Sequence, residues 1–192
     1  MTPTNSRPPE PLPAQVLIPG ADAPSLFLMP GAVSFVRRAA RLRTLLGSCV
    51  AVVVWQPRVR WGGMCHYLLS ERAGVPGPAA EEDGRFATDA LAMLEHQMRE
   101  TGLAPSQYQA HIVGGSNCFP EGRVDLGRIG ERNAQWAKDW CASLQLPVIT
   151  QDTGGRFTRR VEFDLATGVL RVEHTDLRVD PYAAQRPGQD LS

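Results

Sequence analysis

Short apolar runs separated by turn residues dominate the central part of the chain and predict a domain rich in strands. The run from Val50 to Trp55 is mostly β-branched and has the length of a buried strand. Pro57 follows as a turn residue, and Val59 to Leu69 predicts the returning strand of a hairpin. Further strands are predicted in Ser25 to Val36 (interrupted by Pro30-Gly31), Tyr108 to Val113, residues 147–150, Arg160 to Leu165 and Val169 to Val172.

Two other segments show helical periodicity. Between Gly84 and Gly102, apolar residues recur every three or four positions with charges between them, and Gly102 is a suitable terminator. A second such pattern runs from Ile129 to Leu144 and ends before Pro147, because the residue preceding a proline disfavours helical conformation. Since strands outnumber helices and cluster in hairpins, a mixed α/β domain with largely antiparallel pairing is favoured over regular βαβ winding.

The two ends of the chain lack this patterning. Residues 1–24 are rich in Pro, Ser and Ala, and residues 176–192 are polar, so we expect disordered tails around one domain at 25–175. A chain of 192 residues that is 43% hydrophobic suits a single core. It has no signal peptide and no apolar run of the roughly 18 residues that span a membrane, which predicts a cytoplasmic protein that is not membrane-inserted.

Charge and cysteine content narrow the function classes. Twenty basic residues balance twenty acidic ones, and the pI is about 6.9, so no global field favours nucleic acid or an anionic membrane as a partner. The four cysteines form no CxxC pair, and a chain of this size needs no disulfide framework, so we expect thiols. They are Cys49, Cys65, Cys118 and Cys141.

One cysteine lies in a setting that suits chemistry. Gly47 and Ser48 directly precede Cys49, and such small residues leave a side chain accessible and let backbone N–H groups face an oxyanion. A hairpin loop centred directly after Pro57 would place Cys49 opposite His66, with Cβ atoms about 4.5 to 5.5 Å apart. Because Pro57 excludes a two-residue primed turn, we expect a four-residue loop.

A thiol and an imidazole at this distance can carry nucleophilic catalysis. A thiolate beside an imidazolium attacks a carbonyl carbon, and the imidazole then protonates the leaving group and activates water. Thr44 is the nearest candidate for a group that orients His66. Inert structural roles for the pair stay open, because cysteines in apolar strands and lone histidines commonly have them. A zinc site is a further alternative, although the usual short ligand spacing is missing from Cys49, Cys65, Cys118, His66 and His111.

The segment TLLGSCVAVVVWQP, followed by GGMCHYLL, is the most specific motif in the chain. It resembles the signature of the CheD family of chemoreceptor glutamine deamidases, in which a GSC cysteine precedes a histidine by 17 positions, as Cys49 precedes His66. The likeness continues in family order through RFATDA, HIVGGSNCF, IGERN and QDTGGRFTRRVEFDLATGVL, and covers roughly residues 28–174. Several segments in order are a far stronger signal than one GSC.

This resemblance implies hydrolysis of particular glutamine side chains in the cytoplasmic helices of methyl-accepting chemoreceptors, leaving glutamate and ammonia. Cys49 would be the nucleophile that forms a thioester, His66 the general base and acid, and Thr44 the third member. In some family members that threonine lies six positions before the cysteine, where this chain has Arg43. The implied fold is an α/β sandwich with helices on one side of layered β-sheets, and we expect no cofactor or metal.

The chain departs from the family pattern near the expected site. Ser116 and Cys118 stand where alanine and methionine are common, and Cys65 where asparagine or alanine often stands, which could add a polar group or redox sensitivity. Gly114 and Gly115 would permit close backbone approach to a substrate, although glycines that end a strand are also common in turns.

The sequence also suggests substrate-binding residues and an alternative function. Gly47, Ser48, Gly114 and Gly115 are candidate substrate-binding or oxyanion residues, whereas Asp152-Thr153-Gly154-Gly155 is interpreted as a turn. The alternative function is a non-catalytic regulatory module that binds chemoreceptors or a CheC-type phosphatase, a partner that the family resemblance suggests.

Overall fold

The computed structural model describes residues 15–18, 23–71, 82–117 and 128–176. The strands in these ranges are β1 (Gln15–Ile18), β2 (Ser25–Leu28), β3 (Val33–Val36), β4 (Arg41–Leu46), β5 (Val50–Gln56), β6 (Trp61–Tyr67), β7 (Gln109–Gly114), β8 (Val148–Thr153), β9 (Phe157–Asp164) and β10 (Val169–Asp176). The helices are α1 (Ala87–Arg99) and α3 (Ile129–Ser143), with a 3-10 turn η1 at Pro105–Gln107.

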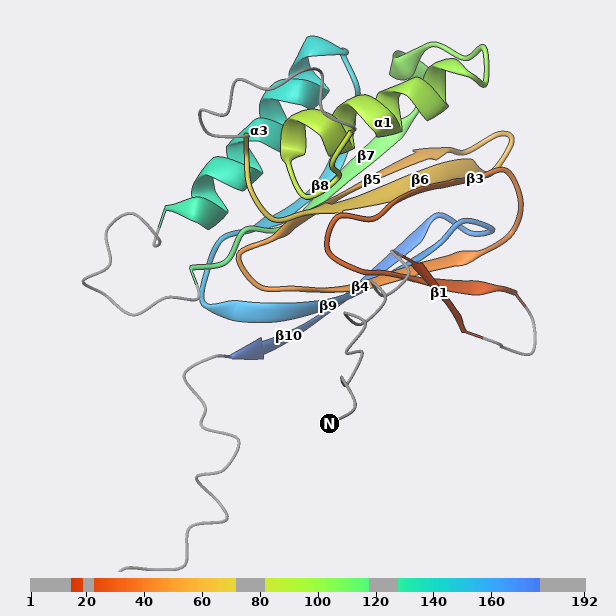
Figure 1. Cartoon of the computed structure of the whole chain (residues 1–192). Helices are drawn as coiled ribbons and strands as arrows, with labels where there is room; N and C mark the ends of the chain where they lie inside the picture. The colour runs from red at the N-terminus through yellow and green to blue at the C-terminus, as the bar shows by residue number, and fades with distance from the viewer. Residues whose placement is uncertain (1–14, 19–22, 72–81, 118–127, 177–192) are drawn as a thin grey trace, which may run out of the picture.

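The strands form two five-stranded sheets. The first sheet has the order β1-β2-β4-β9-β10 and the second sheet the order β3-β6-β5-β7-β8. Neighbours are antiparallel except for the β2–β4 and β7–β8 pairs. The sheets are stacked, and both helices pack on the outer face of the second sheet (Figure 1). This confirms the expected α/β class of layered, largely antiparallel sheets with helices on one side.

Strand β5 has a hydrophobic core on each of its faces. Because side chains alternate along a strand, Val50, Val52 and Val54 face the helices, whereas Ala51 and Val53 face the first sheet. All five side chains are fully buried. The continuous apolar run in the sequence thus reflects burial on both faces, which only a central strand of a covered sheet experiences.

Both predicted helices are confirmed. Helix α1 ends at Arg99, and the N–H of Gly102, which has φ +74°, donates to the Arg99 carbonyl oxygen at 2.9 Å. Helix α3 presents a buried stripe of mostly small side chains, which lets it pack closely on the second sheet. That stripe consists of Gly130, Asn133, Ala134, Ala137 and Cys141.

Strand β4 was missed in the sequence analysis, which described its region only as basic. Leu42, Thr44 and Leu46 are buried, whereas Arg41 and Arg43 are half-buried. The strand therefore has the period of two expected of a half-buried strand, and the arginines obscured it. In the structure the arginines reach acidic side chains on β9, which allows them to line the solvent face of the sheet.

The expectation of a tail at residues 1–24 needs correction at β1, which pairs antiparallel with β2. The apolar run Val16–Ile18 is long enough to form a short strand once an edge is available. The expected tail at 176–192 needs correction at Asp176, which ends β10. Residues 1–14, 19–22 and 177–192 of the expected tails lie outside the described residues, as does Cys118.

The β5–β6 hairpin has the expected four-residue loop, residues 57–60, but not the expected register. Ala51, not Cys49, lies opposite His66, so the predicted direct pairing is wrong. The loop is centred one position later because the side chain of Gln56 accepts two N–H groups from within it. A slip of two residues leaves Cys49 on the same face as Ala51, since side chains alternate with a period of two.

Candidate active site

His66 lies on β6, and its side chain contacts the first sheet. It is only 2% exposed. Its Nδ1 lies 2.8 Å from Oγ1 of Thr44 on β4 and 3.4 Å from the carbonyl oxygen of Leu28 on β2. The Thr44 hydroxyl also lies 2.8 Å from that Leu28 oxygen, to which it donates. The imidazole is therefore held by two strands of the opposite sheet.

These contacts select one tautomer of His66. Because the hydroxyl proton of Thr44 is used on Leu28, the hydroxyl oxygen is left to accept, so we assign the ring proton to Nδ1. Nε2 then carries a lone pair. Nε2 is buried and has no hydrogen-bond partner among the described residues, so it is not bonded to the Cys49 thiol in this structure.

Burial also sets the charge of His66. Desolvation lowers the pKa of the imidazole to about 4, and the Leu28 carbonyl opposes the shift only in part. At neutral pH the ring is therefore neutral. This favours a histidine that removes a proton from a thiol during reaction, in place of the resting imidazolium considered in the sequence analysis.

Cys49 lies directly before β5, is partly exposed and packs against the core between the sheets. The loop from Gly47 to Cys49 is held in place by hydrogen bonds that its backbone carbonyl oxygens accept. These bonds are Ser116 N–H to Gly47 at 2.9 Å, Asn133 Nδ2 to Ser48 at 3.1 Å, and Gly115 N–H to Cys49 at 2.7 Å. Because a trans peptide points its carbonyl and the following N–H in opposite directions, the Ser48 N–H faces away from Ser116 and the Cys49 N–H faces away from α3.

Gly114 and Gly115 pack against this loop. They adopt φ of +116° and +66°, where side chains are rarely tolerated. A Cβ on Gly114 would lie 2.2 Å from the Cys49 carbonyl oxygen, and one on Gly115 would lie 2.6 Å from the Gly130 oxygen. The close approach predicted for these glycines is thus made to the protein's own backbone. Beyond them, Gly154 and Gly155 form the expected turn, whereas Asp152 and Thr153 end β8.

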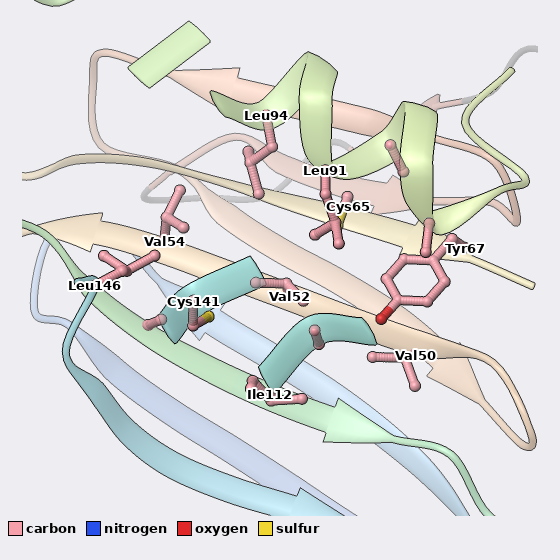
Figure 2. Packing of buried hydrophobic residues seen from close by; sticks show 14 of the residues in the cluster. Val50, Val52, Val54, Cys65, Tyr67, Leu91, Leu94, Ile112, Cys141 and Leu146 are labelled. Atoms are coloured by element: carbon pink, nitrogen blue, oxygen red, sulfur yellow. The ribbon is translucent and has the colours of Figure 1, made fainter. Parts of the chain in front are cut away.

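The remaining cysteines have different surroundings. Cys65 adjoins His66 in sequence but faces the helices, in the same core as Cys141 (Figure 2). Burial raises the pKa of each thiol to about 12, which makes both unreactive.

His111, a candidate zinc ligand, lies on the other side of the second sheet from these two thiols. It packs against the Phe163 ring, with ring centres 5.3 Å apart. Within the described ranges, no three potential metal ligands gather in a group.

Arg159 is a buried charge close to the Cys49 loop that the sequence analysis did not identify. It is 2% exposed and lies opposite Leu46, the last residue of β4. Its guanidinium donates to the Asp152 carboxylate at 3.0 Å, to the Gly154 carbonyl at 2.8 Å and to the Ser116 hydroxyl. The signal was present in the sequence, because Arg159 occupies the inward register of an otherwise apolar alternation on β9.

Asn133 was also missed, although its IGERN segment contributed to the family resemblance. It is fully buried on α3, and its side chain contacts Ser48, just before Cys49, and Leu68, two residues after His66. A polar residue within a stripe of small apolar residues was the available signal, since buried amides are retained where they have specific partners.

Comparisons with known proteins agree with this picture. A model of the CheD family, described as CheD chemotactic sensory transduction, matches residues 68–174. Among curated relatives, the probable chemoreceptor glutamine deamidase CheD 1 of Chromobacterium violaceum is 34% identical over 184 residues, covering 94% of this chain and 92% of the relative. The probable chemoreceptor glutamine deamidase CheD of Pseudomonas savastanoi pv. phaseolicola is 35% identical over 169 residues, covering 87% and 94%.

A third relative, the probable chemoreceptor glutamine deamidase CheD 3 of Dechloromonas aromatica, is 36% identical over 143 residues, with coverage of 74% and 83%. No helix in the described part of the chain is both long and apolar enough to cross a membrane. These three relatives match 74% to 94% of this chain at 34% to 36% identity. The chain therefore belongs to the CheD family.

Proposed function

We propose that this protein is a cytoplasmic deamidase that converts glutamine side chains on the cytoplasmic helices of methyl-accepting chemoreceptors to glutamate and releases ammonia. Family membership and the names of the relatives support this assignment. The observation that carries the chemistry is the 2.8 Å contact between Thr44 Oγ1 and His66 Nδ1. It leaves the basic Nε2 available on the same side of the second sheet as Cys49.

In the first half-reaction, Nε2 of His66 removes the thiol proton while Sγ of Cys49 attacks the carbonyl carbon of the glutamine amide. The contact between thiol and imidazole closes when substrate binds, as catalytic hydrogen bonds often do. The Nδ1–H bond to Thr44 strengthens as the ring becomes charged. Nε2–H then protonates the amide nitrogen, the C–N bond breaks, ammonia leaves and a thioester remains on Cys49.

The second half-reaction returns the enzyme to its starting state. Neutral His66 removes a proton from water, the resulting hydroxide attacks the thioester carbon, and the C–S bond breaks. The thiolate of Cys49 recovers its proton from the imidazolium, and the product carboxylic acid leaves and gives up its proton to solvent to become glutamate. Each turnover consumes one water and releases one ammonia, with no cofactor.

The negative oxygen of each tetrahedral intermediate is stabilised by backbone N–H groups of the Gly47–Cys49 loop. Anchoring of the loop carbonyls to Ser116, Asn133 and Gly115 supports this assignment, because it fixes the direction of the N–H groups of Ser48 and Cys49 before substrate arrives. Preorganised donors stabilise a transition state without reorganising during the reaction. Gly114 and Gly115 act here by holding the loop.

The test is incubation with purified chemoreceptor cytoplasmic domains, followed by peptide mass mapping for Gln-to-Glu conversion and measurement of ammonia. We expect conversion by the wild type and none by Cys49→Ala or His66→Ala. Cys65→Ala is the matched control, because this thiol lies on the opposite face of β6. Full activity in Cys49→Ala would overturn the mechanism. Receptor binding without conversion by the wild type would favour the regulatory alternative.

A further inference from the structure

Asn133 contacts both of the segments that hold the proposed catalytic pair. Its side-chain Nδ2 donates to the carbonyl oxygen of Ser48 at 3.1 Å and to that of Leu68 at 2.7 Å. Its own backbone carbonyl accepts the hydroxyl of Tyr67 at 2.7 Å. Figure 2 shows the Tyr67 hydroxyl directed toward α3. A single fully buried residue thus joins the loop before β5, the end of β6 and the helix.

Two of the residues that Asn133 contacts are close in sequence to the proposed catalytic pair. Ser48 is the residue directly before Cys49, and Leu68 is two residues after His66. Movement of Asn133 would therefore displace the nucleophile and the base relative to each other. We propose that Asn133 is a positioning residue that fixes the Ser48–Cys49 peptide against the end of β6, an inference that rests on the proposed function.

The side chain is suited to donation alone. Both bonds come from the amide nitrogen, whereas Oδ1 is buried and has no hydrogen-bond partner among the described residues. An amide NH₂ group has two hydrogens and can serve two carbonyl oxygens at once. A carboxylate in the same place would direct lone pairs at both carbonyls, and an apolar side chain would remove the donor that Asn133 gives to each.

The bond to Ser48 also determines the orientation of the nucleophile's own amide. The Ser48 carbonyl and the Cys49 N–H belong to one planar trans peptide and point in opposite directions. While Asn133 holds the carbonyl, the Cys49 N–H is directed away from α3, and it is one of the two N–H groups proposed to bind the oxyanion. Loss of the bond lets this peptide rotate and misaligns the donor together with the sulfur.

The test compares Asn133→Asp with the wild type, because the substitution removes both donors and preserves the shape of the side chain. Tyr67→Phe is the matched control: it deletes the hydroxyl bond to α3 and leaves the Ser48 and Leu68 contacts in place. Two readouts are taken: kcat and KM for deamidation of receptor domains, and the rate of Cys49 alkylation by iodoacetamide without receptor, followed on the Cys49 peptide by mass spectrometry.

For Asn133→Asp we expect kcat to fall by about 10- to 100-fold with KM little changed, and Cys49 alkylation to slow by about tenfold. The deficit should shrink as the pH approaches about 5, because a buried carboxyl is readily protonated and then donates one hydrogen bond. For Tyr67→Phe we expect changes below about threefold in both readouts. If the Asp variant does not fold, Asn133→Ser provides the same comparison, since its hydroxyl is too short to reach both carbonyls.

Wild-type kcat and a wild-type alkylation rate in the folded Asn133 variant would overturn the inference. So would a loss that is equal in Tyr67→Phe, because it would show a general packing role for this region. If the wild type fails to deamidate receptors while the Asn133 variant still slows alkylation, the proposed substrate is wrong and the positioning role stands. The two failures are therefore distinguishable.

Discussion

Replacement of Thr44 by valine tests the contact on which the proposed base depends. Thr44 is fully buried, and its hydroxyl lies 2.8 Å from both His66 Nδ1 and the Leu28 carbonyl oxygen. Valine has nearly the same shape and no hydrogen-bonding atom. In the variant, Nδ1–H is left with the Leu28 oxygen, which lies at 3.4 Å and makes a weak bond at best.

The size of the effect follows from the groups that lose a partner. Two buried polar groups, Nδ1–H and the Leu28 carbonyl, lose their bonds to Thr44 but can still approach each other, so we expect destabilisation by about 2 kcal/mol. In the transition state the ring is charged, and a hydrogen bond to a charged group contributes about 1.5 to 3 kcal/mol. At about 1.4 kcal/mol per factor of ten, kcat should fall about 10- to 100-fold.

The assay measures kcat for ammonia release from receptor domains, with urea unfolding for stability. Thr44→Ser keeps the hydroxyl and should remain within about threefold of the wild-type kcat. Arg43→Met is a second control, because Arg43 faces outward to Glu162, with Nε to Oε2 at 2.7 Å, and should leave kcat unchanged. A Thr44→Val enzyme with the same kcat as Thr44→Ser would refute the assignment of the orienting role.

Three further changes have defined outcomes. Burial lowers the pKa of His66 to about 4, below its value of about 6.5 in the unfolded chain. The stability that depends on neutral His66 is therefore complete above about pH 6.5 and falls as the pH drops toward 4. Urea unfolding should show a loss of about 2 kcal/mol at pH 5, and this loss should be absent in His66→Gln. Asp152→Asn removes the carboxylate partner of buried Arg159 and should lower the free energy of unfolding by about 3 kcal/mol. Gly114→Ala puts a Cβ 2.2 Å from the Cys49 oxygen at φ +116°, and should destabilise the fold by about 2 kcal/mol or more and slow Cys49 alkylation.

Each change has a matched comparison. A pH slope that persists in His66→Gln would assign it to other groups, such as His111, whose pKa burial also lowers. An Asp152→Asn protein as stable as the wild type would show that the guanidinium is satisfied by its other partners. Gly102→Ala is the control for Gly114→Ala, because Gly102 has φ +74° but open space around its Cβ; equal effects of the two would exclude a role for the Cys49 contact.

The elements recognised from the sequence were those whose signal is local. The β-branched run of β5 and the helical stripes of α1 and α3 depend on neighbours within a few residues, so periodicity identified them. Strand β4 escaped because Arg41 and Arg43 masked its alternation, and only their partners on β9 make that pattern favourable. The predicted hairpin register was wrong by two residues because the Gln56 side chain accepts two N–H groups of the loop and so moves its centre by one position.

In the candidate site, too, only the features with a local sequence signal could be predicted. Cys49 and His66 were found from a motif with fixed spacing, which records chemistry directly. The contact of His66 with Thr44 and Leu28 joins two sheets, so its distance could not be derived from local pattern. The same holds for Asn133, which is 85 positions from Ser48 and 65 from Leu68 in sequence. Burial, which neutralises His66, is likewise a property of the assembled fold.

The most direct test of the central claim is the rate at which Cys49→Ala converts receptor glutamines to glutamates, measured by peptide mass mapping beside the wild type on the same receptor preparation. Urea unfolding of both proteins establishes that the variant is folded. The proposed mechanism predicts conversion by the wild type and none by the variant above that of receptor alone. Conversion by folded Cys49→Ala at the wild-type rate would contradict it.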